Sequence, residues 1–370
     1  MAATDMTEPL LALFTRDGYA RVEPPVLQPA DVFLDLSGED MRRRLFVTED
    51  ADGQELCLRP EYTIPVCRQY LAQHEVGAIA AFSYAGPVFR LRSGETGEFA
   101  QAGIESIGRI DADAADAEVL SLAIEAAALM GLTTPSISIG DMAILDRLVD
   151  QLGLDAPTKR RLTRRIVRGK GLPKLHVAAA AAANDANGDY AGLLAAIDGK
   201  NEKAAHAFVE DVLAIAGISR VGGRTAGEIA ERFLKRAARR TGAIGDEARA
   251  VLERYLAING DPVTVALALR GLATEAKLDL DRVVDAFEAR TGFMAARDIN
   301  VGELVFSASF ARNLDYYTGF IFEMVDRRQP DRPVAGGGRY DGLIARLGAS
   351  RPIPAVGCSL WLERFDGGGK

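Results

Sequence analysis

Two alternating segments joined by a short polar turn constrain this chain more than any other feature. AFSYAGPVFRLR (81–92) and EFAQAGIESIGRI (98–110) alternate in polarity, and SGETG connects them. Strands linked by so short a turn pair antiparallel, because a parallel crossover needs about a dozen residues. LFVTEDADGQELCLRPEY (45–62) predicts a second hairpin with its turn at ADG. We therefore expect a largely antiparallel sheet.

Helical periodicity occurs on both sides of these strands. TIPVCRQYLAQ (63–73) and DAADAEVLSLAIEAAALMGL (113–132) carry apolar residues at helical spacing. Asp113 or Asp116 is in the right place to cap the second helix, and Gly131 to end it. Helices of this kind are expected to cover the sheet.

The composition and the apolar spacing of the chain change in its middle. From about residue 143 to 300 alanine dominates and the apolar spacing is helical, and strand patterns return at ELVFSASF (303–310). This order predicts an α+β fold. We expect a core of residues 1–142 and 301–370, interrupted by a largely helical insertion at 143–300.

Composition argues against several classes of function. The net charge of −8 argues against a nucleic-acid partner, and the basic run at 161–174 is more typical of a solvated helix face. No histidine lies near another histidine or a cysteine at metal-site spacing, so no metal or cofactor is expected. No signal peptide or membrane span is evident. The scattered, odd-numbered cysteines fit a reducing cytoplasm; they are Cys57, Cys67 and Cys358.

Alternation divides the segment EFAQAGIESIG into two faces. One face carries Gln101 and Glu105 beside Gly103, and the other is apolar. Such a polar face either lines a pocket or is solvated, and one strand alone favours the solvated alternative.

Two further segments combine polar groups with apolar surroundings. LDYYTGFIFEM (314–324) predicts a strand in which Asp315 and Tyr317 share a face while Tyr316 takes the other. Two adjacent tyrosines usually mean one core and one rim residue. AGGGRYDGL (335–343) contains a run of three glycines, Gly336, Gly337 and Gly338, which allow close approach of a ligand or backbone, or form a flexible turn.

Each segment alone is a weak signal, but the segments taken together and in this order form a specific pattern. LRPEYTIPV, YAGPVFR, GEFAQAGIESIG, ARNLDYYTGFIFE, AGGGRYDGL and VGCSLWLERF occur in this sequence. The series resembles the catalytic domain of histidyl-tRNA synthetase, which has a class II aminoacyl-tRNA synthetase fold. VEPPVLQ resembles the first class II motif, which builds a dimer interface. FRLR with EFAQ resembles the second motif, and LWLERF the third.

The resemblance implies roles for particular residues. A carboxylate can hold an α-ammonium group, and another acidic or phenolic group can fix an imidazole. Three arginines match those that grip ATP or face the activated carboxylate, namely Arg90, Arg312 and Arg364. The implied histidine-binding set is Glu61, Thr63, Gln101, Glu105, Tyr316, Tyr317 and Tyr340.

Three departures change the function that the resemblance implies. The chain ends soon after the third motif, so we expect no anticodon-binding domain. SGETG (93–97) is short and lacks the loop arginines of the synthetase. Tyr62 stands where the enzyme typically has glycine. A chain of this kind resembles a paralogous family, the regulatory subunits of ATP phosphoribosyltransferase.

That resemblance implies a chain without catalysis of its own. It would activate a short-form catalytic subunit in the first step of histidine biosynthesis and allow feedback inhibition by histidine. It would dimerise within a hetero-octamer and bind no tRNA. Whether histidine occupies the synthetase-like pocket or a subunit interface stays open.

Two alternatives remain from the sequence. One is a truncated synthetase paralogue that activates an amino acid with ATP, since the three arginines are present. The other is a scaffold that has kept the fold and lost every ligand.

Overall fold

The computed structural model describes residues 6–36, 43–92, 94, 96–172, 244–310 and 316–365. These residues form a nine-stranded sheet of order β1-β5-β6-β12-β11-β10-β7-β9-β8. Only β1 with β5 and β7 with β9 pair parallel among the described strands, so the largely antiparallel sheet of an α+β fold is confirmed. The strands are β1 (Ala20–Arg21), β5 (Ala80–Phe89), β6 (Glu98–Ile107), β7 (Ser136–Asp141), β8 (Asn259–Gly260), β9 (Leu304–Ser307), β10 (Phe320–Val325), β11 (Pro333–Arg339) and β12 (Ala355–Trp361).

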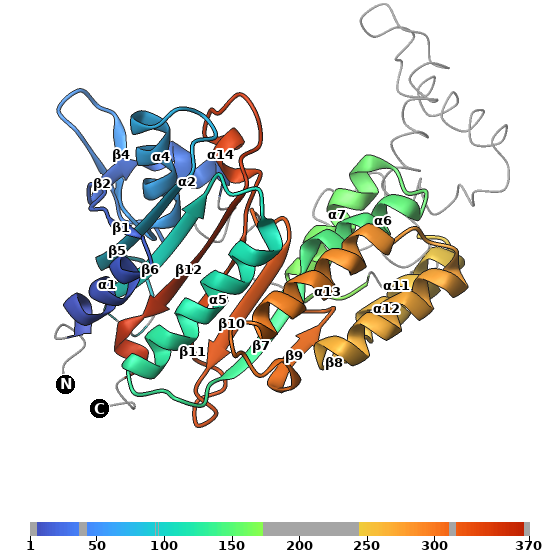
Figure 1. Cartoon of the computed structure of the whole chain (residues 1–370). Coiled ribbons are helices and arrows are strands. Elements are labelled where there is room, and N and C mark those ends of the chain that lie inside the picture. Colours follow the sequence, from blue (N-terminus) through green and yellow to red (C-terminus); the bar gives the residue numbers. More distant parts are fainter. Residues whose placement is uncertain are drawn as a thin grey trace, which may run out of the picture.

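A second, smaller sheet carries the predicted hairpin at 45–62. Its order is β2-β4-β3, and β3 pairs antiparallel with β4 around the turn at Gly53. It lies beside three helices at the upper left of Figure 1. The elements of this region are β2 (Leu27–Pro29), β3 (Val47–Glu49), β4 (Glu55–Leu58), α2 (Ala30–Leu36), α4 (Thr63–Gln73) and α14 (Leu343–Arg346).

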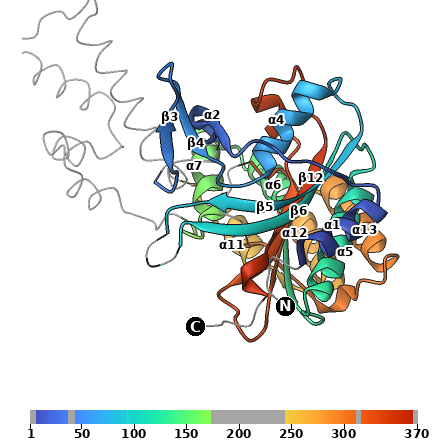
Figure 2. The same ribbon diagram turned by 90° about the vertical axis from the view of Figure 1, so that its left-hand side faces the viewer.

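Both faces of the large sheet are buried. Ala102 and Ile104 of β6 belong to one apolar core, with α1 (Thr7–Arg16), α5 (Ala112–Leu129) and α13 (Asp281–Ala295). Phe99 and Ile107 of the same strand belong to a second core, with α4. Figure 1 shows α5 and α13 across one face, and Figure 2 shows α4 and α5 on opposite sides of β5 and β6. The alternation predicted for β6 is correct, but the solvated-face interpretation is wrong.

The described part of residues 143–300 is mostly helical. It contains most of α6 (Met142–Gln151), then α7 (Ala156–Val167), α11 (Asp246–Leu256), α12 (Pro262–Ala276) and α13. The apolar faces of these helices pack in the same core as α5. Strand β8 pairs with β9 and so adds an edge strand to the large sheet. We therefore propose that the described helices of this insertion pack as part of the core. No described helix is long and apolar enough to cross a membrane.

Two predictions from local pattern are wrong. Helix α5 begins after Asp111, and neither Asp113 nor Asp116 caps it. Asp116 is buried and pairs with arginines instead. Strand β10 begins at Phe320, so the two tyrosines before it lie outside the strand. Long-range ion pairs and the strand register decide both features, and neither is visible in a local pattern.

The run Gly336, Gly337 and Gly338 lies inside β11, between β10 and β12, so the flexible-turn interpretation is wrong. A Cβ at Gly337 would overlap the carbonyl oxygen of Gly357 on β12. The alternative of close approach by another backbone is confirmed at this position.

We predict opposite effects for two glycine-to-alanine changes. Gly337→Ala should lower the free energy of unfolding by about 2 kcal/mol or more, because the clash is with backbone. Gly271→Ala lies in α12 with open space around it and should raise that free energy by about 0.5–1 kcal/mol. Urea denaturation of the full chain measures both, and equal effects of the two changes would contradict this account.

Candidate functional site

A buried glutamate from the large sheet organises the predicted pocket residues. Glu105 of β6 is 1% exposed. Its carboxylate accepts hydrogen bonds from Thr63 Oγ1 at 2.7 Å and from Tyr340 Oη. Burial raises the pKa of Glu105 to about 8, while these hydrogen bonds act in the opposite direction. The group is a carboxyl that holds its proton near neutral pH, and a positive charge bound beside it would favour its ionised form.

A second carboxylate lies at the start of α4. Glu61 accepts the backbone N–H groups of Thr63 at 2.7 Å and Ile64 at 2.9 Å. The helix N-terminus favours negative charge, so Glu61 is held in a fixed position beside the first turn. Burial raises the pKa of Glu61, although these N–H groups and the positive charge of Arg90 oppose the shift.

Three predicted tyrosines meet at this carboxyl pair. Tyr340 follows β11, and its ring packs edge-on against Tyr316 with ring centres 5.9 Å apart. Tyr317 is tilted against Tyr316 at 5.0 Å. Tyr316 is buried and Tyr317 half-buried, as expected for one core and one rim residue. We call Glu61, Thr63, Tyr84, Glu105, Tyr316 and Tyr340 the Glu105 cluster.

Gln101 lies four residues before Glu105 in β6, so the two side chains share a face of the strand. It is 1% exposed, and its Oε1 has no hydrogen-bond partner within the described part of the chain. A buried acceptor without a donor is costly, so this position favours a ligand or water that brings an N–H or O–H.

Tyr84 of β5 was not predicted. Its hydroxyl lies 2.8 Å from Ser359 Oγ and 3.4 Å from Glu105. Glycines on neighbouring strands make room for this group: a Cβ at Gly103 would overlap Tyr84, and one at Gly357 would overlap Glu105. The only sequence signal for Tyr84 is that a glycine faces it on the paired strand. That signal can be recognised only when the strand register is known.

Tyr62 fills space next to the cluster. Its ring stacks on Tyr84 with centres 4.3 Å apart, and the Arg59 guanidinium lies 4.2 Å from the opposite face of the ring. A Cβ at Gly86 would overlap its hydroxyl. The expectation that a bulky ring here occupies ligand space is consistent with this packing.

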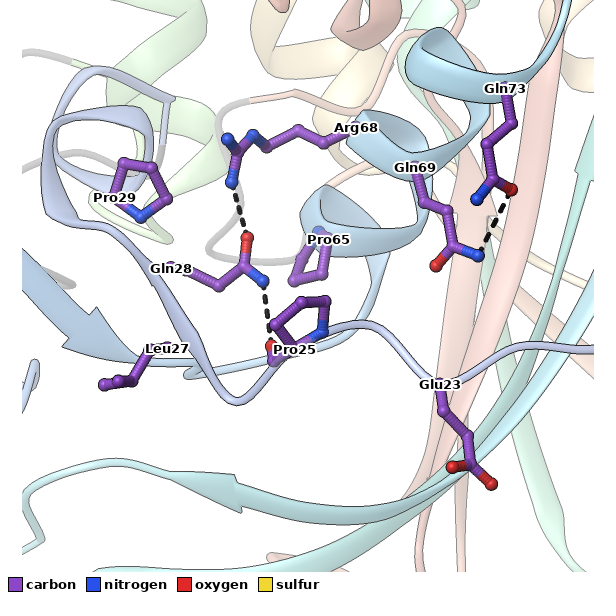
Figure 3. Close-up of a pocket in the computed structure, with 9 residues that line it drawn as sticks. All are labelled: Glu23, Pro25, Leu27, Gln28, Pro29, Pro65, Arg68, Gln69 and Gln73. Atoms are coloured by element: carbon purple, nitrogen blue, oxygen red, sulfur yellow. Dashed lines mark hydrogen bonds between the residues drawn. The ribbon is translucent and has the colours of Figure 1, made fainter.

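Two surface cavities lie outside the predicted set. One of about 490 Å³ is shown in Figure 3, where Arg68 Nη1 donates to Gln28 at 2.6 Å. Another of about 540 Å³ lies around Phe99 and Glu363. Neither is lined by a predicted histidine-binding residue. No group of three or more His, Cys, Asp or Glu side chains suited to a metal occurs among the described residues.

The predicted ATP arginines contact protein groups. Arg90 Nε donates to the Pro60 carbonyl at 2.6 Å, and burial lowers the pKa of Arg90 to about 10. Arg364 Nη1 donates to the Pro333 carbonyl, and its guanidinium lies 4.7 Å from the centre of the Trp361 ring. Arg312 lies outside the described residues.

The antiparallel sheet, its helices and the acidic, tyrosine-lined cluster define a histidyl-tRNA synthetase-like protein of class II fold. The family model described as histidyl-tRNA synthetase matches residues 1–221 and 226–365. A solved ATP phosphoribosyltransferase regulatory subunit/histidyl-tRNA synthetase from Bacillus halodurans has a TM-score of 0.68 at 20% identity, covering 98% of this chain and 78% of that one. A histidyl-tRNA synthetase from Nostoc has a TM-score of 0.63 at 16% identity, covering 96% and 69%.

Proteins similar in sequence identify a narrower family within the histidyl-tRNA synthetase-like class. A protein named ATP phosphoribosyltransferase regulatory subunit from Mesorhizobium japonicum is 40% identical over 96% of this chain and 94% of its own length. One of the same name from Agrobacterium fabrum is 38% identical over 99% and 98%. This chain belongs to the family of ATP phosphoribosyltransferase regulatory subunits.

The protonated state of Glu105 predicts a pH dependence of stability. Between about pH 4.5 and pH 8 the folded protein keeps a proton that the unfolded chain has released, so the free energy of unfolding should fall as pH rises. The slope from one such group approaches about 1.4 kcal/mol per pH unit. Glu105→Gln, neutral at every pH, should lose this part of the slope in urea denaturation from pH 5 to pH 8.

Glu253→Gln is the matched control, because Glu253 is a surface residue of α11 paired with Arg249. It should keep the wild-type slope. A Glu105→Gln slope equal to wild type would mean that Glu105 is ionised in the folded protein across this range.

Proposed function

We propose that this chain is the non-catalytic regulatory subunit that activates a short-form ATP phosphoribosyltransferase and makes it sensitive to histidine. The supporting observation is a buried acidic cluster with an unpartnered amide oxygen, in a chain whose relatives carry the regulatory-subunit name. Regulation follows from linkage. A subunit assembly in which the pocket binds histidine more tightly is favoured when histidine is present.

The chemistry of the Glu105 cluster supports histidine as its ligand. Glu105 and Glu61 offer carboxylates to an α-ammonium group, and ionisation of Glu105 would be driven by that positive charge. Gln101 Oε1 offers an acceptor to a ligand N–H group. Tyr316, Tyr317 and Tyr340 offer aromatic surface and hydroxyl groups to an imidazole.

Loss of ATP chemistry is supported by what the remaining groups contact. Arg90 and Arg364 each bond a backbone carbonyl of this chain, and Tyr62 occupies the stack between Arg59 and Tyr84. These bonds fix each guanidinium against protein and leave it fewer N–H donors for a phosphate. We propose on this basis that no amino-acid activation takes place.

We propose self-association through the segment that resembles the first class II motif. Val26 and Leu27 are 38% and 49% exposed, and Val47 on β3 is 51% exposed. Exposed apolar side chains close together in one small sheet are typical of protein contacts. The resulting dimer would join the catalytic subunit in a hetero-octamer, without tRNA. The three cysteines are buried and form no disulfide among the described residues, which supports a cytoplasmic location.

The central prediction concerns the catalytic partner. A short-form ATP phosphoribosyltransferase should form phosphoribosyl-ATP faster when this chain is added, and histidine should reverse the gain. Product formation across a histidine titration measures both effects. No change in rate together with no complex by gel filtration would remove the regulatory role.

A second prediction places histidine at the Glu105 cluster. Glu105→Gln cannot supply a carboxylate to the α-ammonium group, so the histidine concentration for half-inhibition of the complex should rise about tenfold or more. Glu253→Gln should leave it unchanged. Unchanged inhibition in Glu105→Gln, with activation intact, would move the histidine site to a subunit interface.

A third prediction separates this role from that of an amino-acid-activating paralogue. The wild-type chain should catalyse no histidine-dependent exchange of pyrophosphate into ATP, because Arg90 and Arg364 are bound to protein and Tyr62 fills the adjacent space. Exchange above background, abolished by Arg90→Gln, would establish the enzymatic alternative.

A further inference from the structure

The residues on either side of Tyr340 connect the Glu105 cluster to a second buried cluster. Tyr340 donates to Glu105, on the α4 side of the sheet. Arg339, one position earlier, reaches the opposite side and donates to Asp116 of α5 at 2.6 Å. Successive side chains at a strand end point to opposite faces. A movement of Tyr340 therefore acts on Arg339 through a single peptide unit.

The second cluster is a chain of buried ion pairs. Asp116 lies 3.1 Å from Arg290 Nε on α13, and Arg290 Nη1 donates to Asp141 at 2.7 Å. Exposed fractions are 1% for Asp116, 5% for Asp141 and 6% for both Arg290 and Arg339. The two buried arginines also pair with more exposed carboxylates, Arg290 with Asp113 at 3.6 Å and Arg339 with Asp341 at 3.0 Å. Separating Asp116 from either arginine would leave its own buried charge less compensated, so a shift of one of these side chains is expected to shift the others.

Hydrogen bonds connect the segment that carries Tyr316 and Tyr317 to residues 339–341. Thr318 N–H donates to the Arg339 carbonyl at 2.8 Å, and Asp341 N–H donates to Thr318 Oγ1 at 3.0 Å. Asp341 also accepts from Arg339 Nη1 at 3.0 Å and from the Ala355 N–H at 2.9 Å. The turn that carries Tyr316 and Tyr317 is therefore bonded to the residues that flank Tyr340.

We propose that Arg339 and Asp116 are positioning residues that couple occupancy of the Glu105 cluster to the stability of helix α13. A bound ammonium group would compete with the Tyr340 hydroxyl for the Glu105 carboxylate. The resulting shift of Tyr340 displaces Arg339 and changes its contact with Asp116, and Asp116 transmits the change to Arg290. By reciprocity, anything that rearranges α13 changes affinity at the cluster by the same factor. Within this proposal, only the identity of the ligand, histidine, rests on the proposed function.

The coupling is measured first without any ligand. Tyr340→Phe removes one hydroxyl at the cluster, and Arg290→Lys keeps the charge on α13 but lacks the second guanidinium arm that reaches both aspartates. The two changes share no direct contact, so independent sites would give additive effects. We expect the unfolding equilibrium constant of the double variant to differ from the additive value by about threefold or more.

A matched control needs a surface arginine that does not pair with α13. Because Arg270 itself pairs with Asp285 of α13, the control is Arg254→Lys: Arg254 lies on α11 and pairs at the surface with Glu275 of α12, outside the buried chain of ion pairs. Combined with Tyr340→Phe, Arg254→Lys should be additive. Additivity of Arg290→Lys with Tyr340→Phe, within the error of that control, overturns the proposal.

Hydrogen exchange provides a test that needs no change on α13. In full-length Tyr340→Phe, amides of α13 should exchange about threefold faster or more than in wild type, while those of α1 stay unchanged. Equal exchange in α13 overturns the proposal even if Arg290→Lys fails to fold. Histidine should alter α13 exchange in wild type. A non-additive cycle in a chain that binds no histidine would keep the coupling and refute the proposed ligand.

Discussion

A carboxyl group enclosed by protein on all sides needs hydrogen-bond donors within reach, and Glu105 takes its donors from segments far apart in the chain. Thr63 comes from α4, Tyr84 from the neighbouring strand, and Tyr340 from the end of β11. These groups can converge only if β5, β6, β12 and β11 adjoin in this order. Burial of one glutamate thus depends on the topology of the whole sheet, and glycine on β12 leaves the room that its carboxylate needs.

The same arrangement separates binding from chemistry. The groups suited to an amino acid lie together in the Glu105 cluster, whereas the arginines suited to ATP are bonded to carbonyls of the chain. A protein with a preserved amino-acid site and occupied phosphate-binding groups can respond to a metabolite without transforming it. Its effect must then pass to a partner through differences in stability between conformations or assemblies. The buried ion pairs next to Tyr340 offer a physical route for such differences.

Local patterns predicted the elements well where their residues contact near neighbours in sequence. Helix α4 spans Thr63–Gln73, as its periodicity predicts, and β5 and β6 pair as a hairpin with both faces alternating as expected. Prediction failed where a residue's partner is distant. Asp116 looks like a helix cap but pairs with Arg290 and Arg339. The tyrosines before β10 alternate like strand residues, yet the pairing of β10 with β7 begins only at Phe320.

The sequence by itself determined the antiparallel strands, the helices that cover them and the family resemblance, because periodicity and motif order are local and cumulative. It also singled out Glu61, Thr63, Glu105, Tyr316 and Tyr340, since their types and spacing follow known motifs. Only the tertiary structure decided that Glu105 is protonated near neutral pH, that Tyr84 joins it, and that Arg90 and Arg364 are engaged by protein groups. These properties arise from burial and from contacts across the sheet, which depend on strand register and which no stretch of sequence contains.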